Sequence, residues 1–284
     1  MSYGLPYQGS KSKIAPWVID HLPDSDILVD LFAGGCAVTH AAIVSEKFRG
    51  GAIVNDISNA PQLFVDAING KYSDINHLPS REEFYDTDLG KDALTRLVSS
   101  FGNNGKDYAY GRDVCDVKNL AENMLLAKTV DKRYSLFKDF IKVYDSEKKS
   151  PDKLQALENL SRLQALENLS RLQRLQRLVS VSQRSYNEVK IPDNSTIYAD
   201  PPYRGTNTSL YGDFDFDKFY EWVSNCGHMI IISEYTAPTH CVEVASIKTT
   251  SSMSANGKGQ DVTERLFVQE EYEEEYRRAM GQLF

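Results

Sequence analysis

A strand, a glycine turn and a helix near the amino terminus constrain the fold of this chain most. Residues 27–32 (ILVDLF) form an apolar run of strand length, residues 33–35 (AGG) follow as a tight turn, and residues 37–48 have the pattern of a helix. This order is typical of open α/β sheets, in which glycines let the backbone approach a ligand at a strand end. We therefore expect an α/β domain with a ligand site beside Gly34.

A second strand is predicted over residues 52–55 (AIVN) and ends at Asp56. In such folds an acid at this distance binds ribose hydroxyls, which predicts a ribose-containing cofactor. The chain has neither a G-x-G-x-x-G fingerprint nor a G-x-x-x-x-G-K-[ST] phosphate loop. The lack of a pyrophosphate cradle argues against NAD and ATP and is compatible with S-adenosylmethionine. The alternative is that the glycines form only a strand-to-helix turn.

Four residues at the end of a third predicted strand suit one chemical task. They are Asp200, Pro201, Pro202 and Tyr203, and they follow the β-prone residues 196–199. A nucleobase amine is a poor nucleophile until hydrogen-bond acceptors draw it towards tetrahedral geometry, and Asp200 offers a carboxylate beside the Pro201 carbonyl. The prolines stiffen the loop and remove two N–H donors, and Tyr203 offers a ring on which a flipped base can stack. An ordinary proline turn is the alternative interpretation.

Residues 7–13 (YQGSKSK) form a basic, glycine-containing loop that leads into a predicted helix. Beside a cofactor site, this loop would place Lys11 within reach of a carboxylate and Tyr7 against the cofactor. Taken alone, the same pattern is typical of a solvated helix start.

In their order along the chain, these motifs resemble those of the Dam-like family of DNA adenine N6-methyltransferases of bacteria and phages. The motifs are Tyr7-x-Gly9-x-Lys11, residues 29–35 (VDLFAGG), residues 55–57 (NDI) and residues 200–203 (DPPY). The resemblance implies an α/β fold with a Rossmann-like, S-adenosylmethionine-dependent methyltransferase sheet and helices on both faces. It further implies an enzyme that methylates adenine N6 of a flipped base in duplex DNA and releases S-adenosylhomocysteine.

The resemblance also assigns roles to individual residues. The expected catalytic residues are Asp200, Pro201, Pro202 and Tyr203. The expected cofactor-binding residues are Tyr7, Lys11, Asp30, Phe32, Gly34, Asp56 and Asp200, with Asp200 between the cofactor and the target amine. No metal is expected.

The sequence departs from the family pattern at two positions, and three further stretches fit it. Cys36 replaces the second glycine of the broader F-x-G-x-G pattern, and Ser185 precedes Tyr186 where relatives often have an Asp for the cofactor's adenine. Residues 101–112 resemble the aromatic, Asn- and Gly-rich segment between the two main motifs. Residues 228–235 have the pattern of a central strand, and residues 252–256 followed by 263–268 resemble a closing hairpin.

Between residues 70 and 180 the pattern changes, because strong strands are missing and residues 120–127 and 134–144 have a helical composition. We predict a catalytic domain formed by residues 1–69 and 181–284, and a mostly helical, DNA-recognising insert over residues 70–180. Residues 91–190 carry 19 Lys and Arg against 13 Asp and Glu, whereas the whole chain carries 32 against 40. A basic stretch of this kind on an acidic chain is suited to DNA phosphates; a solvated helical face is the alternative. The acidic residues 270–275 are expected to point away from DNA.

The insert contains a repeat: residues 154–162 (LQALENLSR) recur letter for letter at residues 163–171. Leucine recurs there every third residue. Because an α-helix has about 3.6 residues per turn, these leucines would wind around the helix and would not form the single apolar stripe of a coiled coil. We interpret the repeat as a tandem duplication tolerated in a surface helix; a role of its arginines in DNA contact is the alternative.

Composition is consistent with a folded intracellular enzyme. Four scattered cysteines without C-x-x-C spacing, in a chain of 284 residues with 41% hydrophobic residues, indicate a reducing compartment and no zinc site. A signal peptide and a membrane span are not predicted, so we expect a cytoplasmic protein of a bacterium or a phage-infected cell, with double-stranded DNA as its partner and a monomeric or weakly dimeric state.

Three alternative functions remain open from the sequence. Cytosine-N4 methylation has the same geometry, and methylation of RNA or a protein amide uses similar motifs. A catalytically silent DNA-binding phage protein is a third alternative. For the adenine methyltransferase that the resemblance implies, a role in restriction and modification is expected.

Overall fold

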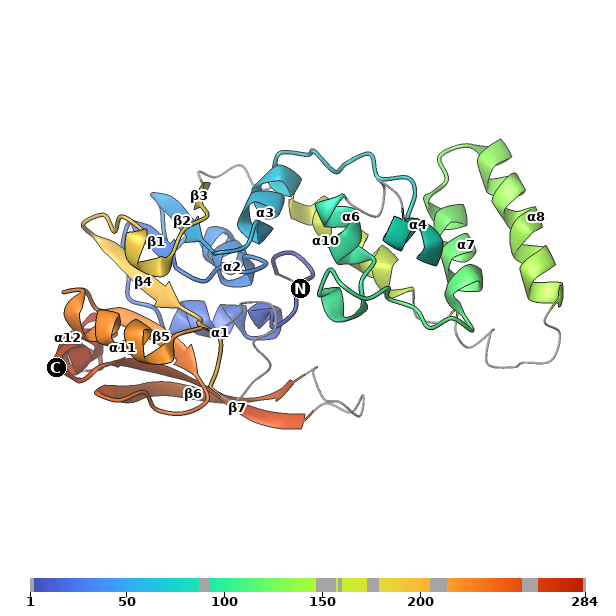
Figure 1. The fold of residues 1–284 in the computed structure, drawn as a ribbon. Helices are drawn as coiled ribbons and strands as arrows, with labels where there is room; N and C mark the ends of the chain where they lie inside the picture. The colour runs from blue at the N-terminus through green and yellow to red at the C-terminus, as the bar shows by residue number, and fades with distance from the viewer. Residues whose placement is uncertain are drawn as a thin grey trace. The chain divides into compact units, whose positions relative to one another are not determined.

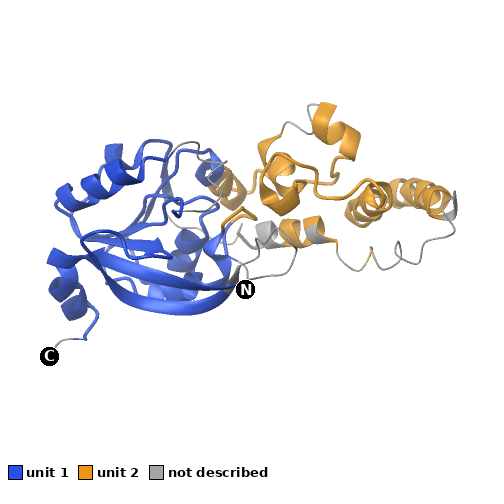
Figure 2. Cartoon of the chain, turned by 60° about the horizontal axis from the view of Figure 1, so that its bottom comes forward, with its two compact units in different colours: residues 1–4, 10–62, 177–284 blue, residues 5–9, 63–176 orange. Residues whose placement is uncertain are grey.

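The computed structural model describes residues 3–86, 92–146, 157, 160–172, 179–204, 214–251 and 260–282. The chain divides into two compact units (Figure 2). Unit 1 contains residues 1–4, 10–62 and 177–284, and unit 2 contains residues 5–9 and 63–176.

Unit 1 is built on a seven-stranded sheet with the order β3-β2-β1-β4-β5-β7-β6 (Figure 1). Strands β1 to β5 are parallel, and β7 runs antiparallel to both β5 and β6. The strands are β1 (Ile27–Asp30), β2 (Gly51–Asn55), β3 (Val179–Ser182), β4 (Ser195–Ala199), β5 (Ile230–Glu234), β6 (Cys241–Ser251) and β7 (Gln260–Gln269). The strand order reverses between β1 and β4, and open α/β sheets bind ligands outside the carboxyl ends of such strands.

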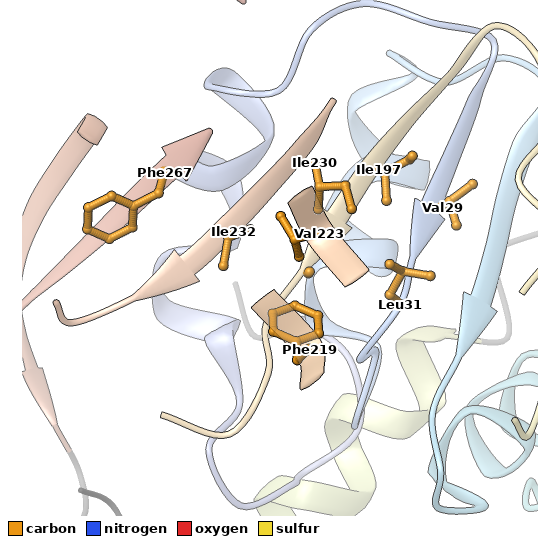
Figure 3. Close-up of a cluster of buried hydrophobic side chains, with 9 residues drawn as sticks. Val29, Leu31, Ile197, Phe219, Val223, Ile230, Ile232 and Phe267 are labelled. Carbon is orange, nitrogen blue, oxygen red and sulfur yellow. The ribbon is translucent and has the colours of Figure 1, made fainter. Parts of the chain in front are cut away.

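One face of this sheet is covered by α11 (Phe216–Asn225). Phe219 and Val223 of that helix lie in a buried cluster with strand residues such as Val29, Ile197 and Ile230 (Figure 3). These strand residues share a face because side chains alternate along a strand.

The opposite face is covered by α1 (Ala15–Asp20) and α2 (Ala37–Ser45). Thr39 of α2 donates a hydrogen bond of 2.7 Å to Asp30, which points away from the α11 face. Near the carboxyl terminus, η4 (Glu270–Tyr272) leads into α12 (Glu273–Ala279), whose Tyr276 donates to the His21 carbonyl after α1. The predicted Rossmann-like α/β sheet with helices on both faces is therefore confirmed.

The expected elements are present with shifted boundaries: the strand predicted over residues 27–32 ends at Asp30, and the strand predicted over residues 228–235 spans Ile230–Glu234. The helix predicted over residues 37–48 ends at Ser45, because Glu46 has a left-handed φ of 60°. Residues 263–268 lie in β7 as expected, and residues 252–256 lie outside the described residues.

Unit 2 is mostly helical in its described residues. Helix α3 (Ala60–Ile68) crosses the boundary from unit 1, and α4 (Arg81–Asp86), α6 (Ala93–Val98), η2 (Phe101–Asn103), α7 (Cys115–Leu126), α8 (Val130–Ser146) and α10 (Ser161–Leu172) follow. Within the described part of this unit, β structure is limited to a bridge between Ser100 and Tyr108. No described helix of either unit combines the length and apolarity that crossing a bilayer requires.

The core of unit 2 contains an arginine from the repeat. Arg162 is 1% exposed, and its Nε donates to Glu122 at 2.6 Å. Its Nη1 also donates to the Pro79 carbonyl at 3.1 Å and to the Tyr108 hydroxyl at 3.2 Å. The expectation that the repeat forms a surface element is therefore wrong at Arg162. A leucine period of three winds around the helix, so it does not reveal which side of the helix is buried.

Candidate active site

A corner of buried charges forms at the carboxyl ends of the parallel strands of unit 1. Asp200 follows β4 directly, and its Oδ1 lies 2.9 Å from the Nζ of Lys11 in η1 (Lys11–Lys13). The same ammonium lies 3.8 Å from the Oε2 of Glu264 in β7. The side chains of Lys11, Asp200 and Glu264 are 10%, 17% and 8% exposed. We call these three residues, together with Tyr203, the charged corner.

Tyr203 is fixed within the charged corner by both ends of its side chain. Its hydroxyl donates to Glu264 at 2.8 Å and lies 2.7 Å from the Ser233 hydroxyl. The Nζ of Lys11 lies over its ring, 4.5 Å from the centroid, and Tyr235 packs edge-on against it at 4.5 Å. The ring is thus held in one orientation, as a stacking platform needs to be.

Glu234 forms hydrogen bonds with the backbone that follows the proline loop, residues 200–203. Its carboxylate accepts from the Tyr235 N–H at 2.7 Å and from the Arg204 N–H at 3.3 Å. The loop after β4 is therefore tied to the end of β5.

Burial and pairing act in opposite directions on the ionisable groups of the charged corner. For Lys11, burial lowers the pKa, but the carboxylates of Asp200 and Glu264 outweigh it and leave the pKa raised. For Glu264, burial raises the pKa although Lys11 opposes the shift. The raised pKa of Lys11 keeps its ammonium charged at neutral pH.

A second group of acids lies at the ends of β1 and β2. Asp56 accepts hydrogen bonds from the Gly34 N–H at 2.9 Å and from the Ser58 N–H at 2.8 Å. Asp56 thus fixes the glycine turn, and each oxygen keeps a lone pair that can accept a ligand hydroxyl.

Asp30 is buried beside this group. Burial raises its pKa to about 7; the Thr39 hydrogen bond opposes this rise, and the charges of Asp200 and Asp56 add to it. Its Oδ1 has no hydrogen-bond partner among the described residues, which is consistent with a carboxyl group that is partly protonated at neutral pH.

The raised pKa of Asp30 predicts how stability depends on pH. Between its unfolded pKa near 3.8 and its folded pKa of about 7, the folded state binds the proton that the unfolded state has released. Folding stability should therefore fall as pH rises through this window, by on the order of 4 kcal/mol in total. Asp30→Asn should remove most of this fall in urea unfolding measured from pH 4 to pH 8.

The exposed Asp20 of α1 supplies the matched control. Asp20→Asn should leave the fall unchanged. If Asp30→Asn keeps the wild-type slope, another group causes the pH dependence.

Phe32 lies in an aromatic cluster at the end of β1. Its ring packs against Tyr186 of η3 (Tyr186–Glu188) at 5.7 Å, and against Phe214 and Phe219 at 5.8 and 5.4 Å. Phe219 is fully buried, whereas Phe32, Tyr186 and Phe214 are partly buried and pack against the core around it.

The amino-terminal segment packs directly on the glycine turn. Gly4 has a φ of +70°, and a Cβ at this position would come within 2.7 Å of the Ala37 N. Its N–H donates to the His40 Nδ1 of α2 at 2.9 Å. At the same turn, Cys36 has a left-handed φ of 59°, the conformation that glycine adopts at least cost.

Gly4→Ala should destabilise unit 1 through both its backbone conformation and this close contact. Gly9 is a matched control, because it has a φ of +75° but no atom within 4 Å of an added Cβ. Gly9→Ala should cost about 1 kcal/mol for the left-handed backbone alone, and Gly4→Ala about 2 to 4 kcal/mol. Equal losses of free energy of unfolding would show that the contact with Ala37 relaxes without cost.

A family model gives the independent comparison. The model of the D12 class of N6 adenine-specific DNA methyltransferases matches residues 7–251. The chain belongs to this family. The methyltransferase is adenine-specific and DNA-directed, which decides against cytosine N4, RNA and protein amides as the target class.

Other comparisons add little. A search of curated proteins finds no match. Among solved structures, the rRNA methyltransferase aviRa from Streptomyces viridochromogenes is similar at 13% identity, covering 95% of this chain and 89% of that chain. Its TM-score of 0.36 is too low to support a conclusion about this methyltransferase.

Most residues predicted from the sequence lie at one edge of the sheet. Lys11, Asp200 and Tyr203 are in direct contact, and Asp56 contacts Gly34. The other predicted residues of unit 1, Asp30, Phe32, Pro201 and Pro202, lie at the ends of β1 and β4. Tyr7 belongs to unit 2, so its role in cofactor binding stays a prediction.

Sequence reasoning missed Glu264 and Ser233 as members of this site. Glu264 shares its strand face with Leu266 and Val268, both fully buried. A carboxylate at an inward-facing position of an apolar strand was the signal that could have found it. Within the described residues, groups of three or more His, Cys, Asp or Glu side chains suited to a metal ion are absent.

Proposed function

We propose that this methyltransferase transfers a methyl group from S-adenosylmethionine to the N6 amine of an adenine flipped out of duplex DNA. The charged corner carries this proposal, because Asp200 and the fixed ring of Tyr203 flank two prolines at the end of β4, and β4 pairs with β1, the strand before the glycine turn. Asp200 and the Pro201 carbonyl would hold the amine, and Tyr203 would stack on the base.

The chemistry of the site fits this cofactor. Asp30, Asp56 and Asp200 place carboxyl groups at the ends of three adjacent strands, and Lys11 is already paired with Asp200. A phosphate-bearing cofactor would be repelled by this arrangement, whereas a cationic one is attracted. S-adenosylmethionine supplies an electrophilic methyl group on a positively charged sulfur.

The residues of the corner act mainly by positioning and electrostatics. Asp200 and the Pro201 carbonyl accept the two N–H bonds of the target amine and direct its lone pair at the methyl carbon. As the nitrogen–carbon bond forms and the sulfur–carbon bond breaks, the Asp200 carboxylate stabilises the positive charge that develops on N6. One amine proton then leaves to solvent. Lys11 covers one face of the Tyr203 ring, so the base would stack on the other face.

Unit 2 is the proposed DNA-recognition lobe. Exposed cations occur along α8, among them Lys132, Arg133, Lys138 and Lys142. Phe101 is exposed, and it begins the loop between Ser100 and Tyr108, which pair in an isolated β-bridge. Cations for phosphates and exposed rings for bases are the groups that nucleic-acid binding uses.

The test is a product analysis. The purified protein is incubated with unmethylated duplex DNA and methyl-labelled S-adenosylmethionine, and the DNA is digested to nucleosides. Labelled N6-methyl-2′-deoxyadenosine is the expected product, and its formation on duplex DNA should exceed that on single strands. Label in no nucleoside, or in cytosine, would contradict the proposal.

A further inference from the structure

Glu264 has no role in the reaction outlined above, although burying a carboxylate carries a large desolvation penalty. Its carboxylate is buried among Lys11, Tyr203 and Ser233, and burial raises its pKa. A buried carboxylate persists only with partners, and replacing such a group by an apolar side chain often stabilises a protein. Its position therefore calls for a reason other than stability.

The charge balance between Lys11 and the carboxylates of the charged corner offers a reason for the position of Glu264. Lys11 is the one cation within ion-pair distance of Asp200 among the residues that the structure describes. With Asp200 alone, the ammonium would neutralise the carboxylate that has to meet the target amine and the methyl donor. With Glu264 at 3.8 Å, one ammonium is shared by two carboxyl groups, and the three side chains carry a net charge of −1 when both carboxyl groups are ionised.

The effect of this surplus charge depends on the ligand. The substrate form of the cofactor carries a positive sulfur, whereas the product S-adenosylhomocysteine has a neutral thioether. The two molecules otherwise share the same adenosine and amino-acid parts. A fixed negative charge in a buried site therefore favours the substrate form over the product.

We propose that Glu264 is a specificity-determining residue of the methyltransferase, which keeps the corner negative despite Lys11 and thereby favours the sulfonium cofactor over its neutral product. The proposal rests on the proposed function, because it requires S-adenosylmethionine as the methyl donor. Glu264 acts through electrostatics and through Lys11, so it is a positioning residue and does not touch the reacting atoms.

The test compares two affinities in one protein. Calorimetry gives the dissociation constants of S-adenosylmethionine and of S-adenosylhomocysteine for the wild type and for Glu264→Gln, which keeps the size of the side chain and removes its charge. We expect Glu264→Gln to weaken S-adenosylmethionine about 5- to 30-fold and to change S-adenosylhomocysteine by less than about 2-fold. A purely structural role would weaken both ligands equally.

Three further variants complete the test. Glu264→Asp keeps the charge, and Tyr203→Phe removes the hydrogen bond to Glu264 without changing any charge, so both should keep the wild-type ratio of the two affinities. Glu264→Met is a second neutral replacement, should the Gln variant not fold. The proposal is overturned if a folded neutral variant of Glu264 keeps the wild-type ratio of the two affinities. It is also overturned if Tyr203→Phe changes this ratio as much as the neutral variant does. Wild-type protein that binds neither ligand would instead contradict the proposed function.

Discussion

Asp200→Ala should lower kcat for DNA methylation by about 1,000-fold or more, because it removes both an acceptor for the target amine and the charge that stabilises the developing cation. The fold should survive, since Lys11 keeps Glu264 as a counter-ion at 3.8 Å. Asp200→Asn separates the two contributions, because the amide keeps one acceptor oxygen and loses the charge. We expect its kcat to lie between those of the wild type and the Ala variant.

A matched control lies in the same unit. Asp217 is an exposed carboxylate that pairs with Arg204 at 2.8 Å, just beyond the proline loop. Asp217→Ala should leave the thermal unfolding midpoint close to that of the wild type, and it should leave kcat within about 2-fold. Single-turnover methylation of a labelled duplex measures the chemical step, and thermal unfolding verifies the fold. An Asp200→Ala variant that methylates DNA near the wild-type rate would show that Asp200 is not the amine acceptor.

Four of the five parallel strands, β1, β2, β4 and β5, were predictable because their elements are local, whereas β3 (Val179–Ser182) was not predicted from the sequence. The apolar run before Asp30, the glycines after it and the β-prone residues before Asp200 each determine their structure within a few positions. A strand buried on both faces reads as a continuous apolar run, so β1 and β4 are visible in the sequence. Their polar ends then meet at one edge because parallel strands share a direction.

The contacts of the charged corner depend on long-range packing, which periodicity does not encode. Glu264 reaches Lys11 because β7 returns antiparallel beside β5, and pairs Leu266 with Ser233. The pattern of β7 predicts a strand, but it does not predict the strand's neighbour. Arg162 shows the same limit in unit 2, where its partners Pro79, Tyr108 and Glu122 come from three separate segments.

Arg162→Ala should destabilise unit 2 by about 3 to 5 kcal/mol, the cost of leaving a buried charge without its partner. Glu122 is 0% exposed, and among the described residues it would keep one side-chain hydrogen bond, from the Tyr110 hydroxyl. The Pro79 carbonyl would lose its arginine donor as well. Urea unfolding followed by circular dichroism measures the loss, and limited proteolysis locates it in unit 2.

An exposed ion pair of the same unit provides the control. Lys128 lies 2.8 Å from Asp74, with both side chains more than half exposed. Lys128→Ala should cost about 1 kcal/mol or less, because water and salt already screen this pair. A loss as large as that of Arg162→Ala would mean that burial does not set the difference.

The double variant Arg162→Met with Glu122→Leu separates lost charge from lost packing. Because both charges are removed together, no unpaired ion remains, and most of the stability should return. The repeat offers a further comparison, since Arg171 holds the same place in the second copy as Arg162 in the first. If Arg171→Ala lowers the free energy of unfolding as much as Arg162→Ala does, both copies of the repeat contribute a stabilising arginine. If only Arg162→Ala lowers it, the first copy alone contributes to the core, and the duplication added no second buried arginine.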